Sequence, residues 1–283
     1  SMSGRAPGPL GLAAEAARRG SRLLTVGAGD SPLEQVAVST GGVHVRVPAP
    51  ASPAARASRM GMWSLLTPVL AAAHRVGLTG TSDAVLEAVA DRLDARAAGY
   101  RPASEAFVNP AKGLAIELSD CVPVVLGDGD VTGVAASRAV AMLARTARVP
   151  AMRGALPDDA GDVVATFGGP FAARQDDDVF ADPFLDGPRR VALRLLLLRD
   201  AEPSLDRPDG TWLVTSRTAD AVRVTAQEAG VRVTEVSAEP GHPLERFADL
   251  VSLTDFASTY LALASGLDQL TSPHVADLRD RTR

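Results

Sequence analysis

Residues 109–131 read NPAKGLAIELSDCVPVVLGDGDV, and the order of segments in this stretch points to an α/β protein. Residues 112–118 have the composition of a short helix, and the apolar run at 121–126 predicts a buried strand. The turn residues at 127–130 lead into an Ala- and Val-rich segment at 131–146, which predicts a second helix. A strand with a helix on each side is the repeating unit of a parallel sheet covered by helices.

The same stretch holds the only Asn, the only Lys and the only Ile of the chain, which are Asn109, Lys112 and Ile116. Elsewhere Arg stands in place of Lys, and Val and Leu in place of Ile, as a GC-rich genome favours. The presence of all three rare residues within the octet 109–116 therefore calls for a specific explanation. For Asn109 a structural explanation exists, because Asn caps helices and the Pro110 that follows suits the first helical position.

Outward from this stretch, helices and strands alternate in both directions. Helices are expected where apolar residues recur at helical spacing between capping and glycine signals, at 9–19, 33–39, 60–76, 84–98, 219–229 and 244–264. Strands are expected at short runs rich in Val and Leu, at 21–26, 43–47, 163–167, 191–198 and 231–236. Because the alternation occurs on both sides of a helical region, the sequence predicts two related α/β lobes.

The overall composition bounds the class of protein. The chain has 283 residues, of which 46% are hydrophobic and 22% charged, and this describes a globular chain with a sizeable core. A formal net charge of -5 argues against nucleic acid as a partner. No apolar run approaches about 18 residues and no signal-peptide pattern occurs, so we expect a cytoplasmic protein without a membrane partner. The single cysteine, Cys121, cannot form an internal disulfide and is expected to be a buried apolar residue.

Two segments rich in Asp are candidates for ligand binding, and each has a simpler interpretation. Residues 127–130 (GDGD) lie between a strand and a helix, where open parallel sheets bind ligands. Carboxylates at this position repel a phosphate, so a tight turn with Asp near the helix start is favoured. Residues 176–178 (DDD) lack the spaced partners of a metal site, so a solvated loop is favoured.

The histidines give little basis for a metal or cofactor site. The chain has four of them, at 44, 74, 242 and 274, and their spacing matches no metal-ligand pattern. No phosphate-binding loop, nucleophile elbow or Cys/His cluster occurs, so neither a metal nor a cofactor is expected. His242 lies in the turn 239–243 after an expected strand and is the histidine best placed for a functional role. The alternative for His242 is an ordinary surface histidine.

Four segments together resemble one protein family. Residues 109–112 (NPAK) with the strand at 122–125 (VPVV) resemble the start of the second sugar isomerase (SIS) domain of bifunctional phosphoglucose/phosphomannose isomerases. Residues 255–268 (DFASTYLALASGLD) resemble the closing helix of that domain. Residues 18–24 and 45–48 resemble parts of the second half of the family's first SIS domain. These segments occur in the family's order and are spread over most of the chain, and they are most similar to the divergent actinobacterial branch.

The resemblance implies two SIS-type, flavodoxin-like lobes of parallel sheet, of which the first is shortened. It implies a partial first lobe at 1–80, a helical connector at 81–108 and the second lobe at 109–283. The first lobe is expected to begin near the family's Ser/Thr-rich sugar-phosphate loop. Asn109 and Lys112 then lie at the entrance to the second lobe, where they are expected to fix how the lobes meet.

The resemblance also implies which residues hold a sugar phosphate. Ser3 stands where the sugar-phosphate loop is expected, with Arg5 in place of the polar residues that usually follow. Arg56 and Ser58 fall in a segment similar to the family's Pro-Arg segment, which helps to bind and open the sugar ring. Arg279 falls near a lysine at the family's C-terminus. Ser3, Arg56, Ser58 and Arg279 are therefore the candidate substrate contacts.

The residues that the family uses for catalysis are missing. Aldose–ketose isomerisation needs a base that moves a proton between adjacent carbons. Arg145 stands where the family's glutamate base is expected, and a guanidinium cannot accept that proton at neutral pH. Residues 156–162 (LPDDAGD) replace the family's histidine-bearing segment and contain no His. Asp158, Asp159 and His242 are possible substitutes, and His242 is the candidate catalytic residue.

Three functions remain open from the sequence. The first is an SIS protein that binds a sugar phosphate or a similar anion and has lost or altered its catalytic residues. The second is an active isomerase that interconverts glucose 6-phosphate or mannose 6-phosphate with fructose 6-phosphate. The third is a structural or regulatory dimer module. A homodimer is expected in each case, because SIS domains commonly pair and a shortened lobe leaves apolar surface to cover.

Overall fold

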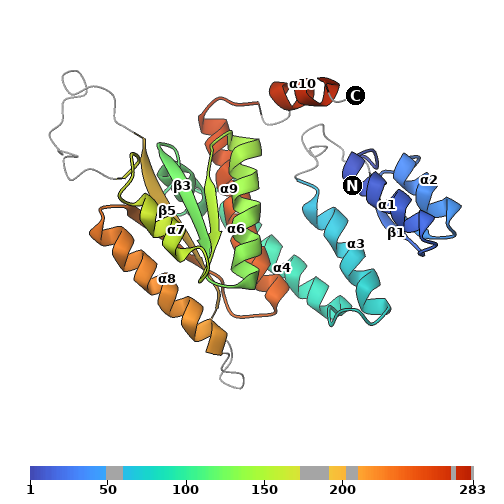
Figure 1. The fold of residues 1–283 in the computed structure, drawn as a ribbon, viewed down its shortest axis with the longest axis horizontal. Helices are drawn as coiled ribbons and strands as arrows, with labels where there is room; N and C mark the ends of the chain where they lie inside the picture. Colours follow the sequence, from blue (N-terminus) through green and yellow to red (C-terminus); the bar gives the residue numbers. More distant parts are fainter. Residues whose placement is uncertain (49–59, 173–190, 202–209, 269–271, 282–283) are drawn as a thin grey trace. The chain divides into compact units, whose positions relative to one another are not determined.

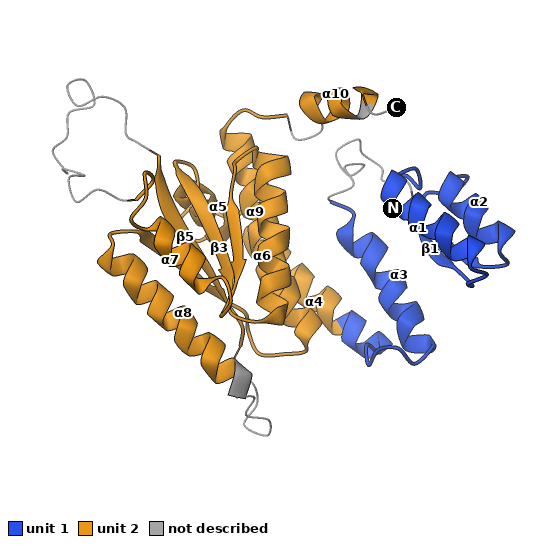
Figure 2. Cartoon of the chain, viewed as in Figure 1, with its two compact units in different colours: residues 1–87 blue, residues 88–283 orange. Residues whose placement is uncertain are grey.

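The structure is a computed structural model, and it describes residues 1–48, 60–172, 191–201, 210–268 and 272–281. The chain divides into two compact units, Ser1–Glu87 and Ala88–Arg283, which are coloured separately in Figure 2. The boundary falls inside the helix α4 (Asp83–Tyr100), within the range expected to connect the lobes. Each unit has a parallel sheet, so the predicted α/β fold with parallel sheets is confirmed. The predicted lobe boundaries themselves stay a prediction.

The first unit is built on a parallel pair of strands. Its elements are α1 (Pro7–Arg18), β1 (Leu24–Gly27), α2 (Pro32–Ser39), β2 (Val43–Arg46) and α3 (Met62–Arg75). The strands β1 and β2 pair with Leu24 opposite Val43. Ser31 caps α2, because its hydroxyl accepts a hydrogen bond from the backbone N of Glu34. The cap and the proline after it fix where the chain turns from β1 into α2.

The second unit is built on a sheet of four described parallel strands. They are β3 (Cys121–Gly127), β4 (Met152–Ala155), β5 (Ala192–Arg199) and β6 (Arg232–Ser237), and they lie in the order β4-β3-β5-β6. The chain therefore enters at β3, crosses to β4 on one side, and then continues with β5 on the other side. Residues 195–198 of β5 are all 0% exposed, as the uninterrupted aliphatic run predicts for a strand covered on both faces.

Helices cover both faces of this sheet (Figure 1). They are α5 (Pro110–Glu117), α6 (Asp130–Met142) with a π-helical turn at Leu143–Ala147, α7 (Ala160–Thr166), α8 (Gly210–Glu228) and α9 (Pro243–Ala264). A further helix, α10 (Pro273–Arg281), lies near the C-terminus. One core lies between the sheet and the α7 and α8 helices, and includes Leu126, Leu195, Phe167 and Val222. On the opposite face α6 and α9 pack against each other. None of the described helices has both the length and the apolar character needed to cross a membrane.

The strand expected at 163–167 is wrong, because these residues belong to α7 and its C-terminal cap. Val163 and Phe167 are four residues apart, which places both on one helix face, and both are buried in the core. The strand in this region is instead β4, which has only four residues and the sequence MRGA. So short a segment at the edge of a sheet carries too few apolar residues to produce a recognisable strand pattern.

Candidate functional site

Open parallel sheets bind ligands beyond the carboxyl ends of their strands, above all where consecutive connections run in opposite directions. In the second unit this point lies between β3 and β5. In the first unit the corresponding edge is formed by the carboxyl ends of β1 and β2. In the described part of the chain, a ligand site is therefore expected first at these two edges.

At the edge of the second unit, the turn at 127–130 brings the start of α6 directly against the end of β3. A Cβ atom on Gly127 would lie 2.4 Å from the backbone N of Gly133, so only glycine fits here without moving the helix. Asp128 follows, and its side chain is 2% exposed. The tight turn with Asp near the helix start, which the sequence favoured, is the arrangement found.

The Asp128 carboxylate is held by groups of the chain itself. Its Oδ2 lies 2.9 Å from Nε of Arg199. Its Oδ1 accepts hydrogen bonds from the backbone N of Asp200 at 2.7 Å and from the Thr132 hydroxyl at 3.3 Å. Burial raises the pKa of Asp128, while the hydrogen bond from the Asp200 amide and the charge of Arg199 act in the opposite direction. A buried, paired carboxylate beside the first turn of α6 therefore occupies the position that a phosphate needs.

Two arginines in the described part of this edge, Arg199 and Arg246, are neutralised as well. Nη1 of Arg199 lies 2.9 Å from Oδ1 of Asp220, in addition to the pair with Asp128. Nε of Arg246 lies 2.7 Å from Oδ1 of Asp200. Both guanidinium groups are engaged by carboxylates of the same chain, so ion pairs within the chain fill the described part of this edge.

His242 caps the N-terminus of α9. Its Nδ1 accepts a hydrogen bond from the backbone N of Leu244 at 3.2 Å, and its own backbone N donates to Oε2 of Glu245 at 2.8 Å. Glu245 in turn pairs with Arg92 of α4 at 3.1 Å. These contacts give His242 a structural role, and its catalytic role stays a prediction.

The other residues considered for the catalytic positions are Arg145, Asp158 and Asp159. Arg145 is exposed in the π-helical turn, at the opposite end of α6 from the edge described above. Oδ2 of Asp159 accepts a hydrogen bond from the backbone N of Ala155 at 2.7 Å and so closes the turn after β4. Asp158 is exposed. Within the described ranges, no group of three or more His, Cys, Asp or Glu side chains could hold a metal ion.

Several predicted residues lie outside what the structure describes. Arg56, Ser58 and the acidic segment 176–178 are outside the described residues. Arg279 belongs to α10, but its side chain is not among those described. Their predicted roles therefore stay predictions.

At the edge of the first unit, residues 1–5 run along the end of β1. The backbone N of Ala28 donates to the carbonyl of Met2 at 3.1 Å. Ser3 is exposed, and its hydroxyl accepts a hydrogen bond from the backbone N of Arg5 at 3.2 Å. No side chain caps α1 and no acidic residue lies in its first turn. This edge therefore combines an exposed Arg5 with the positive end of a helix dipole.

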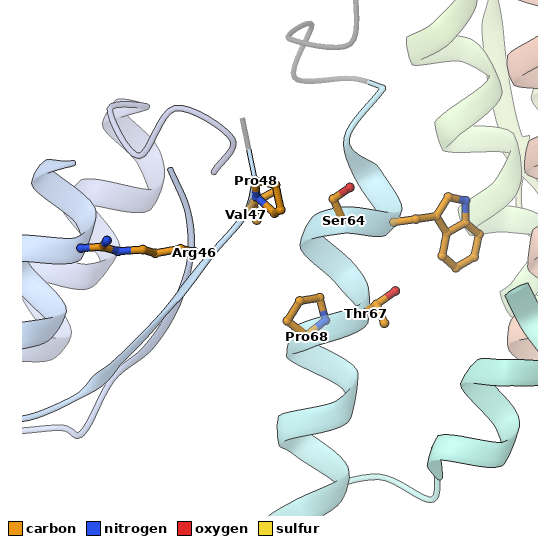
Figure 3. A pocket seen from close by; sticks show the side chains of 7 residues that line it. Arg46, Val47, Pro48, Ser64, Thr67 and Pro68 are labelled. Carbon is orange, nitrogen blue, oxygen red and sulfur yellow. The ribbon is translucent and has the colours of Figure 1, made fainter. Parts of the chain in front are cut away.

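A pocket opens at the same edge, at the carboxyl end of β2. Its volume is about 380 Å³, and it is lined by Arg46, Val47, Pro48, Trp63, Ser64, Thr67 and Pro68. Figure 3 shows Val47 and Pro48 on one side and Ser64 and Pro68 of α3 on the other. The Arg46 side chain extends away from α3, and its Nε lies 2.9 Å from Oε1 of Glu34.

Sequence reasoning missed this pocket and its α3 residues. One signal was present, because Pro68 falls inside the apolar segment that predicts a long helix. An interior proline removes a backbone donor and leaves a carbonyl without its helical partner. The rest of the pocket depends on how β2 and α3 approach each other, which local sequence does not specify.

The octet around Asn109 has a structural explanation. Oδ1 of Asn109 accepts hydrogen bonds from the backbone N of Ala111 and Lys112, and its Nδ2 donates to the carbonyl of Tyr100 at 3.0 Å. Nζ of Lys112 donates to the carbonyls of Pro102 and Ser104 at 2.9 Å and 2.7 Å. Both side chains therefore hold the connection between α4 and α5.

A family model matches the larger part of the chain. Residues 107–282 match the model described as the bacterial phospho-glucose isomerase C-terminal SIS domain. The match begins just before Asn109 and covers the whole described sheet of the second unit. No curated protein matches the chain.

Solved structures with a similar fold include three bacterial proteins. A glucose-6-phosphate isomerase like protein from Thermus thermophilus has 18% identity and a TM-score of 0.55, over 88% of this chain and 67% of its own. A hypothetical protein from the same organism has 15% identity and a TM-score of 0.68, over 100% and 70%. Glucosamine-6-phosphate deaminase from Thermotoga maritima has 10% identity and a TM-score of 0.57, over 97% and 72%. At these identities the likeness concerns the fold.

Proposed function

The chain belongs to the bacterial phospho-glucose isomerase C-terminal SIS domain family, and we propose that it binds a sugar phosphate without isomerising it. The family and the names of two similar structures, which refer to phosphorylated sugars, support this class of ligand. We further propose that the chain derives from the bifunctional phosphoglucose/phosphomannose isomerases, in their divergent actinobacterial branch.

One observation carries the choice of site, namely the contrast between the two sheet edges. The edge of the second unit is filled by the buried ion pair of Asp128 with Arg199. The edge of the first unit has a pocket of about 380 Å³ and an exposed Arg5 near an uncapped helix. Pro7 and Pro9 have no N–H, so the groups near the start of α1 that a phosphate can use include Arg5, Ser3 and the backbone N atoms of Ala6 and Gly8. Arg56, Ser58 and Arg279 are proposed as further ligand contacts.

The residues at the expected catalytic positions support the proposal that the chain does not isomerise its ligand. Arg145 cannot act as a base at neutral pH, since its guanidinium stays protonated. Nδ1 of His242 already accepts the hydrogen bond that caps α9. An active isomerase is the alternative function, with His242 or Asp159 as the base. A coupled assay on glucose 6-phosphate, mannose 6-phosphate and fructose 6-phosphate tests this, and turnover that disappears in His242→Ala or Asp159→Ala would overturn the non-catalytic proposal.

Thermal unfolding tests the binding itself. A ligand at ten times its Kd stabilises the folded state by about 1.4 kcal/mol, which raises Tm by roughly 3 °C in a chain of this size. We expect such a shift with millimolar sugar phosphate and a clearly smaller one in Arg5→Ser. The matched control is Arg22→Ser, an exposed arginine just before β1, at the opposite end of the strand. If no sugar phosphate shifts Tm, binding is refuted and a structural or regulatory dimer module remains.

We also propose that the protein is a cytoplasmic homodimer. The apolar helix α3 supports this, because none of its side chains is fully buried within the chain. Sedimentation at several protein concentrations tests the dimer, and a monomer at every concentration would contradict it.

A further inference from the structure

Pro68 removes one backbone donor from the interior of α3. It lies inside the helix Met62–Arg75 and has no N–H, so the carbonyl four residues earlier, that of Ser64, lacks its donor within the helix. Ser64 and Pro68 lie one turn apart on the same face, and both line the pocket (Figure 3). The pocket is therefore lined by a residue whose main-chain carbonyl lacks the usual donor four residues later.

The charge at the pocket restricts the ligand further. Among the described residues of the lining, Arg46 is the one that is charged, and its guanidinium is engaged by Glu34 at 2.9 Å and by Asp30 at 3.6 Å. A phosphate or carboxylate thus meets a cation that two carboxylates already neutralise. A carbonyl acceptor next to the pocket calls for a neutral hydrogen-bond donor instead.

The remaining lining residues fit the surface of a sugar ring. Val47, Pro48, Pro68 and Trp63 supply apolar and aromatic surface, while Ser64 and Thr67 carry hydroxyl groups. A sugar ring has apolar C–H faces and hydroxyl groups around its rim, so it can use both kinds of surface at once. The volume of about 380 Å³ lies within the range of small-molecule pockets.

We propose that this pocket binds the uncharged ring of a sugar, with a ring hydroxyl donating a hydrogen bond to the main-chain carbonyl of Ser64. This inference rests on the proposed function for the class of ligand, and it assigns the ring and the phosphate to different parts of the first unit. The phosphate is left to Arg5 and the start of α1, and an unphosphorylated sugar still binds in the pocket.

Tryptophan fluorescence tests the proposal directly, because the chain has two tryptophans and only Trp63 lines the pocket. In the full chain carrying Trp212→Phe, all tryptophan emission comes from Trp63. Glucose, mannose and fructose are titrated into the millimolar range, with inorganic phosphate as a parallel titration. The expected result is a saturable change of Trp63 emission with at least one free sugar and none with phosphate.

The variant Pro68→Ala, made in the same Trp212→Phe background, tests the role of the carbonyl. Alanine restores the N–H, so the Ser64 carbonyl regains its helical partner and is no longer offered to a ligand. We expect sugar affinity to fall about 2- to 12-fold, the range for one hydrogen bond, while Tm rises because the helix gains a bond. The matched control is Pro32→Ala at the first position of α2, which frees no carbonyl and is expected to leave affinity unchanged.

Two outcomes would overturn the inference: no response of Trp63 to any free sugar, or equal affinity in Pro68→Ala and Pro32→Ala. Its failure is distinguishable from failure of the proposed function. If sugar phosphates raise Tm while Trp63 stays silent, phosphate binding holds and the pocket assignment is wrong. If free sugars bind at Trp63 and sugar phosphates bind no more tightly, the pocket assignment holds and phosphate recognition is wrong.

Discussion

Arg199 is the residue on which the closed edge of the second unit depends. In Arg199→Met, Asp128 stays buried and loses the positive charge that acts to lower its pKa. The pKa of folded Asp128 already lies above the ordinary value of 3.8, and it rises further in the variant. Such a carboxyl favours folding while it is protonated, and this stability is lost as pH rises through the folded pKa. We expect a loss of about 3–5 kcal/mol at pH 7 and a much smaller loss near pH 4, measured by urea unfolding.

The control for this prediction is Arg223→Met, which removes another arginine near the same sheet edge. Arg223 lies 3.8 Å from Glu235, and its side chain is 34% exposed. A pair of this kind contributes about 0–1 kcal/mol, so little change is expected at either pH. An equal loss in both variants, or a loss in Arg199→Met that does not depend on pH, would contradict the role given to Asp128.

A second prediction at the scale of one residue concerns the contribution of Asn109 to stability. Asn109→Ala removes both the cap of α5 and the donor to the carbonyl of Tyr100, at a side chain that is 1% exposed. We expect a loss of about 2–4 kcal/mol in the free energy of unfolding. Asn109→Ser keeps a capping oxygen and loses only the donor, so it is expected to lose roughly half as much. Chemical denaturation of the unchanged protein and of the two variants shows whether the cap and the donor contribute separately to the free energy of unfolding.

At the scale of elements, the contact between β3 and α6 depends on Gly127. In Gly127→Ala the new Cβ meets the backbone of α6, which can yield only by moving the helix. We expect a loss of about 3 kcal/mol or more. Gly113→Ala is the matched change, since a Cβ there meets nothing within 4 Å and lies inside α5. It is expected to gain about 0.5–1 kcal/mol, and a loss in Gly113→Ala as large as in Gly127→Ala would refute the argument.

Elements with a strong local signal could be predicted from the sequence. The caps at Ser31 and Asn109 and the aliphatic run of β5 act through neighbouring residues, so their position in the sequence is enough. The β4 strand could not be predicted, because four residues at a sheet edge are held by pairing with β3. The partners of Asp128 and the pocket beside α3 could not either, since they join residues far apart in the chain.

At the scale of the whole molecule, we expect the second unit to fold alone. Arg92 and Arg96 of α4 each lie 2.8 Å from a carboxylate oxygen of Asp249 in α9, which ties that part of α4 to this unit. A fragment spanning 83–283 is expected to unfold cooperatively, as followed by circular dichroism during heating. The fragment 1–80 has a sheet of two described strands and is expected to be marginal on its own. A cooperative transition in 1–80 and none in 83–283 would contradict this.

The solitary lysine has a practical consequence for work on the intact protein. A protease that cleaves only after lysine has one bond to cut, between Lys112 and Gly113, because no other lysine exists in the chain. That bond lies in the first turns of α5, and the Lys112 amine is held by the carbonyls of Pro102 and Ser104. Cleavage therefore requires this turn to open, and its rate reports the local opening equilibrium. The digestion yields two fragments, 1–112 and 113–283. The ratio of the intact band to the fragment bands on a gel therefore reports the stability of the first turns of α5.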